Sequence, residues 1–85
     1  MLELDDDALE VFPVDGLAVP LVRMTTGDIP SVQVRLDGLE YQYDRSYPIK
    51  GHSAVMPPYL REQVAGGKKP LLIERPDRFY VYFAA

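Results

Sequence analysis

The sequence predicts an α+β domain, a mostly antiparallel sheet of β-hairpins with one short helix in the order ββ-ββ-α-ββ. Two Asp-Gly dipeptides each lie between runs of alternating apolar residues, which is the strongest local signal for a hairpin. A third pair of apolar runs flanks Pro76-Asp77, another turn signal. Only residues 50–69 combine helical spacing of apolar side chains with a glycine stop.

The first hairpin is expected within residues 9–24, around a turn at Asp15-Gly16. Alternation places four apolar residues on one of its faces: Phe12, Val14, Leu17 and Val19. Pro13 and Pro20 cannot donate to a ladder, so these strands should lie at an edge of the sheet or be partly irregular.

The second hairpin, residues 32–43, is the cleanest of the three. A type I′ turn at Asp37-Gly38 fixes the register, because a two-residue loop pairs the residues that flank it. The expected pairs are Leu36 with Leu39, Arg35 with Glu40, Val34 with Tyr41, and Val32 with Tyr43. One face is then apolar, and the other carries an opposite-charge pair.

The helix is expected near residues 58–65. Pro58 suits a first helical position and pushes the residue before it away from helical geometry. Leu60 and Val64 then share one face, and Met56 extends their line backwards. The pair Gly66-Gly67 ends the helix. A helix this short needs its apolar side packed against a sheet.

The third hairpin, residues 71–83, is apolar on both faces, as in strands that are buried twice. One face carries Leu72, Phe79, Val81 and Phe83, and we expect it to receive the helix. The other face must meet the first hairpin or the same surface of a second copy. We therefore predict a homodimer or other protein interface at Leu71, Ile73, Tyr80 and Tyr82.

Composition indicates one small globular domain spanning residues 1–85, in which residues 1–8 are a candidate flexible acidic arm. The chain has 85 residues, of which 47% are hydrophobic and 26% charged. It has no cysteine, which excludes disulfides and thiolate sites. No apolar run reaches the ~18 residues of a membrane span, and the start is acidic where a signal peptide would be basic. We expect a cytoplasmic protein.

Charge is divided unevenly along the chain. Residues 1–44 hold ten acidic and two basic side chains, whereas residues 45–85 hold seven basic and three acidic ones. Such asymmetry can mark an acidic arm or a basic binding face. We favour the simpler interpretation that the two halves lie side by side and neutralise each other.

No catalytic, metal or cofactor site is predicted. His52 is the only histidine, and its neighbour Ser53 lies in no nucleophile-elbow pattern. The run Gly66-Gly67-Lys68-Lys69 follows the helix, where carbonyl groups and not free N–H groups are presented, so it is not a phosphate loop. A small ligand near Lys50 and His52 is left open.

Nucleic-acid binding is the alternative function. Tyr80 and Tyr82 could stack on bases while nearby cations track phosphates. The cations in question are Arg61, Lys68, Lys69, Arg75 and Arg78. Against this stands an isoelectric point of about 4.7, because non-specific affinity for nucleic acid comes from neutralising phosphates.

Residues 51–82 resemble in part the AbrB-type swapped-hairpin DNA-binding domains. The resemblance is carried by Gly51, Met56-Pro57, Leu60-Arg61, Gly67 and the run LLIERPDRFYVYF. It implies a strand, a short helix and a hairpin that together bind DNA. The spacing from Gly51 to Pro57 is one residue longer than in that family, and Pro58 replaces a polar residue, so we do not assign the chain to it.

The function we predict from these observations is a small non-enzymatic interaction module that associates with itself or with another protein.

Overall fold

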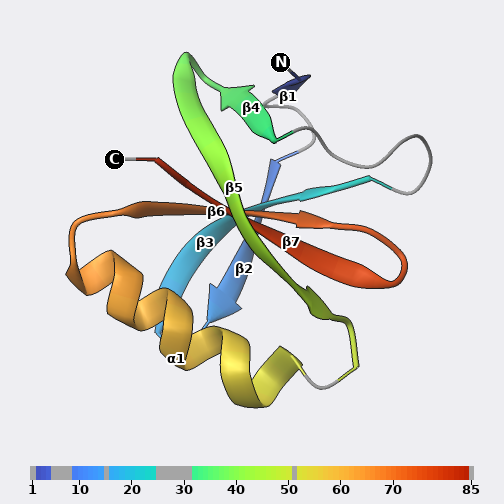
Figure 1. The fold of residues 1–85 in the computed structure, drawn as a ribbon, viewed down its shortest axis with the longest axis vertical. Helices are drawn as coiled ribbons and strands as arrows, with labels where there is room; N and C mark the ends of the chain where they lie inside the picture. The colour runs from blue at the N-terminus through green and yellow to red at the C-terminus, as the bar shows by residue number, and fades with distance from the viewer. Residues whose placement is uncertain (1, 5–8, 15, 25–31, 51, 85) are drawn as a thin grey trace.

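The computed structural model describes residues 2–4, 9–14, 16–24, 32–50 and 52–84, which form seven strands and one helix (Figure 1). The elements are β1 (Leu2–Leu4), β2 (Leu9–Val14), β3 (Leu17–Arg23), β4 (Gln33–Leu36), β5 (Leu39–Pro48), α1 (His52–Ala65), β6 (Lys69–Glu74) and β7 (Arg78–Ala84).

All seven strands belong to one sheet with the order β1-β4-β5-β7-β6-β3-β2. Two neighbouring pairs, β1 with β4 and β3 with β6, run parallel, and the other four are antiparallel. The predicted fold class, a mostly antiparallel sheet of three hairpins with one helix, is confirmed. Strand β1 is not among the predicted elements, because residues 1–8 are expected only as a flexible acidic arm, and residues 5–8 lie outside the described part of the chain.

The second hairpin has the predicted register. Residues pair as Leu36 with Leu39, Arg35 with Glu40, and Val34 with Tyr41. In the turn, Asp37 has φ 53° and Gly38 has φ 78°, as a type I′ turn requires at both central positions. Arg35 donates to Glu40 at 3.1 Å, so the opposite-charge pair also forms.

The first hairpin accommodates its two prolines through its register. Val14 pairs with Leu17 across a two-residue loop, so that pair exchanges hydrogen bonds and every second pair after it does the same. Pro13 and Pro20 fall in the pairs between, where a missing N–H breaks no bond between β2 and β3. As expected from its proline, β2 is an edge strand.

The sheet curls, and its two faces bury two separate cores. On the outer face, α1 contributes Met56 and Leu60 to a core cluster with Leu72, Phe79 and Val81, all of them 3% exposed or less. The inner, concave face buries a second cluster that joins both central hairpins: Val34, Leu36, Tyr41, Leu71, Ile73, Tyr82 and Ala84. The assignment of the third hairpin's two faces is thus confirmed, and one face receives the helix.

The predicted start of the helix is wrong. Helix α1 begins at His52, six residues before Pro58, and holds Pro57 and Pro58 in its interior. A proline there removes a backbone hydrogen bond and is costly. Met56 is fully buried one turn before Leu60, and this packing holds the early turns against the cost of the prolines. The end at Ala65, before Gly66-Gly67, is as predicted.

Among the described residues, no helix is long and apolar enough to cross a membrane.

Candidate functional site

The four residues expected at an interface are mostly buried in the core of the folded chain. Leu71, Ile73 and Tyr82 are completely buried, and Tyr80 is partly buried. Their face is covered by β4 and β5, whose Val34, Leu36 and Tyr41 belong to the same core cluster. The covering element is therefore the second hairpin, and the expectation of the first hairpin or a second copy at this place does not hold.

Burial of this face alters the chemistry of its tyrosines. The ring of Tyr43 lies 5.7 Å from that of Tyr82 and 6.1 Å from that of Tyr80. Burial, with smaller contributions from Tyr43 and Tyr80, raises the pKa of Tyr82 to about 12. Tyr82 therefore stays neutral, and because it is completely buried its ring is not accessible to an external base.

The five cations of the nucleic-acid alternative divide into two groups. Lys68 and Lys69 lie at the start of β6, whereas Arg75 and Arg78 lie at the turn that follows it. A strand advances about 3.3 Å per residue, so the two groups are roughly 20 Å apart. Arg78 also donates to Ser46 Oγ at 2.9 Å. Arg61 is exposed on α1. The cations do not converge on one face around Tyr80 and Tyr82.

Ion pairs only partly join the acidic and basic halves of the chain. Arg23 bridges Glu10 at 3.2 Å and Glu74 at 3.0 Å. Arg35 pairs with Glu40 inside the acidic half. Among these pairs, only the one between Asp44 and Arg45, at 2.9 Å, joins an acidic residue of the first half to a basic residue of the second half. All of these side chains are partly exposed, so each pair contributes little to stability.

The loop considered for a small ligand belongs largely to the helix. His52 is the first residue of α1, and Lys50 is exposed in the turn before it. The cluster Asp5-Asp6-Asp7 lies outside the described residues. Within the described part of the chain, no three His, Cys, Asp or Glu side chains gather in a way that could hold a metal ion.

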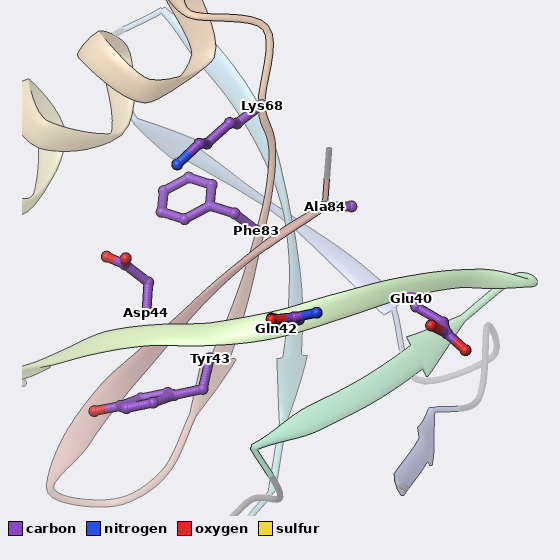
Figure 2. Close-up of a pocket in the computed structure, with 7 residues that line it drawn as sticks. All are labelled: Glu40, Gln42, Tyr43, Asp44, Lys68, Phe83 and Ala84. Atoms are coloured by element: carbon purple, nitrogen blue, oxygen red, sulfur yellow. The ribbon is translucent and has the colours of Figure 1, made fainter.

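A polar groove of about 390 Å³ opens where β5 passes the start of β6 and the end of β7 (Figure 2). Its lining consists of Glu40, Gln42, Tyr43, Asp44, Lys68, Phe83 and Ala84. The ammonium group of Lys68 lies 5.7 Å from the centre of the Phe83 ring. Figure 2 shows Tyr43 pointing to the opposite side of β5 from Asp44.

A β-bulge shapes this groove. The register between β5 and β7 shifts between Tyr43 and Arg45, so Asp44 is the extra residue. Asp44 Oδ2 accepts hydrogen bonds from Arg45 Nε at 2.9 Å and from the Tyr59 hydroxyl at 2.5 Å. The Arg45 guanidinium lies 3.9 Å from the centre of the Tyr59 ring, and Phe83 meets that ring edge-on at 6.0 Å.

These contacts fix α1 to the sheet. Burial and the carboxylate of Asp44 raise the pKa of Tyr59 to about 12, so the hydroxyl remains a donor at neutral pH. Glu40 is likewise engaged by Arg35. Because both carboxylates of the groove serve neighbouring side chains of the same chain, the groove is best explained as a structural junction.

A second, more apolar groove of about 480 Å³ lies at the mouth of the curled sheet. Its residues come from both ends of the strand order: Leu9, Pro20, Leu36, Asp37, Leu39 and Tyr41. Beside it, Val11 of β2 exposes 67% of its surface, and Leu9 exposes 39%. Large apolar residues this exposed on adjoining positions of one strand face are typical of a contact surface.

Strand β2 presents a backbone edge that no other described strand covers. Residues that do not exchange hydrogen bonds with β3 direct their N–H and C=O groups to the outer edge, and in β2 these are Leu9, Val11 and Pro13. In the described part of the chain, no strand pairs with that edge. Leu9 and Val11 therefore combine exposed apolar side chains with outward backbone groups that no described strand pairs with, which makes β2 our candidate site.

Sequence reasoning did not single out Leu9 and Val11. The sequence did contain a signal for them, because Leu9 and Val11 are apolar residues on the strand face opposite to Phe12 and Val14, the residues that were assigned to the core. Residues 9–14 form a strand with apolar side chains on both faces, and such a strand is fully buried only if other elements pack on both faces. Because β2 lies at the edge of the sheet, one of its faces stays partly exposed.

Comparison with known proteins gives no match: no family model, no curated protein and no solved structure is significantly similar to this chain. The partial resemblance of residues 51–82 to AbrB-type domains therefore has no family match behind it.

Proposed function

We propose that this protein is a non-enzymatic interaction module that binds an extended polypeptide segment along the outer edge of β2. The observation that carries the proposal is the exposure of Val11 and Leu9 on an edge strand that borders an apolar groove. An added strand would pair with the free backbone groups of β2 and place alternate side chains toward the groove.

The groove supplies the means of selecting a partner. Pro20, Leu36, Leu39 and Tyr41 give it apolar walls, and Asp37 is its charged residue. Backbone pairing gives affinity for any extended segment, whereas side-chain pockets decide which segment is preferred. The favoured partner is a segment with apolar residues at alternate positions.

Two features support this function over the alternatives. The separation of Lys68 and Lys69 from Arg75 and Arg78 weighs against a phosphate-tracking surface, and a net charge of −4 weighs in the same direction. The carboxylates of the polar groove are held by arginine and tyrosine neighbours, an arrangement typical of structural ion pairs. The cytoplasm remains the proposed location, which fractionation of the source cells would test.

The proposal can be tested with a displayed library of short random peptides. Peptides are selected on the wild-type protein and then compared on Val11→Lys, which places a charge on the edge, and on Val55→Lys. Val55 is a suitable control because it is 53% exposed and lies on α1, outside the sheet. We expect selected peptides to carry alternating apolar residues and to lose binding only to Val11→Lys.

Amide chemical shifts then locate the bound peptide. The proposal requires the largest changes at Leu9 and Val11. Equal binding to Val11→Lys, or shifts centred on Lys68 and Phe83, would contradict it and would direct attention to the polar groove instead.

A further inference from the structure

We propose that the segment that pairs with β2 is β2 of a second copy, joined antiparallel about a two-fold axis centred on Val11. This inference rests on the proposed function and names its partner. It follows from three properties of β2 itself: its edge position, the direction of its free backbone groups, and the places of its proline and its charge.

Backbone geometry limits the registers that are available. Only Leu9, Val11 and Pro13 direct backbone groups outward, and Pro13 has no N–H to offer. In antiparallel pairing, such residues must lie opposite one another to exchange hydrogen bonds. In a register centred on Pro13, the central pair therefore forms no hydrogen bond. In one centred on Phe12, each Val11 lies opposite Pro13 and the pair forms one hydrogen bond instead of two.

Two registers retain the most hydrogen bonds. Centring on Val11 gives two bonds between the Val11 residues and one from each Leu9 N–H to the Pro13 carbonyl of the other copy. Centring on Glu10 gives the same number, through two pairs of Leu9 with Val11. The hydrogen-bond count alone does not separate them.

Charge separates them. Centring on Glu10 places the two Glu10 carboxylates directly opposite each other, which is destabilising. Glu10 has an ion pair with Arg23, but its side chain is 47% exposed, so the repulsion is reduced and not abolished. Centring on Val11 instead places Glu10 opposite Phe12 and brings together the two Val11 side chains, each 67% exposed. We infer this register.

The symmetric pairing also covers what each chain leaves open. Val11, at 67% exposed, contacts its counterpart, and each Leu9 lies at the border of its own apolar groove. An isologous contact of this kind closes on itself and gives a dimer without further growth. Because a single short strand contributes, the interface is small, and we expect a dissociation constant in the micromolar range.

Sedimentation equilibrium on the full chain tests the inference. Wild type and Val55→Lys should both show a monomer–dimer equilibrium, and Val11→Lys should weaken it by about tenfold or more, because it places two lysines opposite each other. Circular dichroism checks that each variant is folded. A wild type that remains monomeric at high micromolar concentration would overturn the inference.

Hydrogen exchange on the wild type needs no variant. Leu9 and Val11 amides should become protected as concentration rises, whereas Glu10 and Phe12 amides, already bonded to β3, should not change. If the chain stays monomeric but library peptides still protect Leu9 and Val11, the second copy is excluded and the proposed function stands. If neither a higher protein concentration nor the library peptides protect the Leu9 and Val11 amides, both proposals fail.

Discussion

Replacing Leu71 with alanine should destabilise the isolated chain strongly. Leu71 is completely buried on the concave face, in the core cluster that contains Val34, Leu36 and Tyr82. The substitution removes three carbon atoms, worth about 0.8 kcal/mol each in transfer from water. The cavity left behind adds to this, so we expect a total loss of about 2.5–5 kcal/mol.

This loss is a large part of the stability available. A chain of 85 residues has a free energy of unfolding of about 4–13 kcal/mol at the usual 0.05–0.15 kcal/mol per residue. Ile73→Val, at a buried neighbour on the same face, offers a milder test and should cost about 0.5–1.5 kcal/mol. Val remains well suited to a strand, so this variant should fold.

Urea unfolding at two protein concentrations measures both effects. The experiments are best done in the Val11→Lys background, so that pairing at β2 does not contribute. If the second hairpin covers this face, each variant lowers the unfolding free energy by the same amount at both concentrations. A loss below about 0.5 kcal/mol for Leu71→Ala, or a loss that depends on concentration, would show that Leu71 lies at a surface between chains.

Tyr59→Phe removes the hydrogen bond to Asp44 and should lower the unfolding free energy by about 1 kcal/mol in urea titrations; an unchanged midpoint would mean that this partly exposed bond adds nothing. Alkaline pH should also destabilise the fold. Tyr82 has a pKa of about 12 when folded, against about 10 when unfolded, so its contribution is complete below pH 10 and is lost as the pH rises towards 12. The part of the loss due to Tyr82 is of the order of 3 kcal/mol and should be absent from Tyr82→Phe, which keeps the alkaline loss due to Tyr59, whose pKa is also raised to about 12. Tyrosinate absorbance is the readout, and a loss in the variant equal to that in the wild type would assign the effect to other groups. Gly38→Ala should cost about 1 kcal/mol because φ is 78° there, whereas Gly66→Ala, where the new Cβ meets only ordinary contacts of 3.4 Å and more, should change thermal stability little.

Local patterns predicted the parts of the fold that local rules determine. The turn at Asp37-Gly38 fixed the register of β4 and β5, and alternation in the third hairpin sorted its residues correctly between the two cores. The end of α1 followed from its glycines. In each case the deciding interaction lies within a few residues of the signal.

The order of strands could not be predicted in the same way. Strand β7 pairs with β5, and β6 pairs with β3. These pairings join different hairpins, so they depend on which surfaces fit together after the hairpins have formed. Sequence reasoning assigns the inner face of the third hairpin to the first hairpin or to a second copy, and hence places an interface at Leu71 and Tyr82, because nothing local shows that the second hairpin curls over it. The prolines predict an edge position for the first hairpin, but the apolar groove beside Leu9 forms only through this strand order, so the candidate site could not be predicted.

The predicted helix is too short for a related reason. The local rule that a proline starts a helix favoured Pro58, but burial of Met56 extends α1 back through both prolines. Packing against the sheet overrides local preference when the packed side chain is large and fully enclosed.

Cross-linking through Val11→Cys tests the pairing of two β2 strands, because the chain has no cysteine of its own that could form a competing disulfide. In the inferred register, the two Cα atoms at position 11 face each other about 5.5 Å apart, within the range of a disulfide. In a glutathione buffer, we predict that Val11→Cys forms a disulfide-linked dimer at micromolar protein concentration, while Val55→Cys and Tyr80→Cys remain monomeric. A dimer formed by Tyr80→Cys and not by Val11→Cys would rule out pairing at β2 and would place the interface at the C-terminal hairpin.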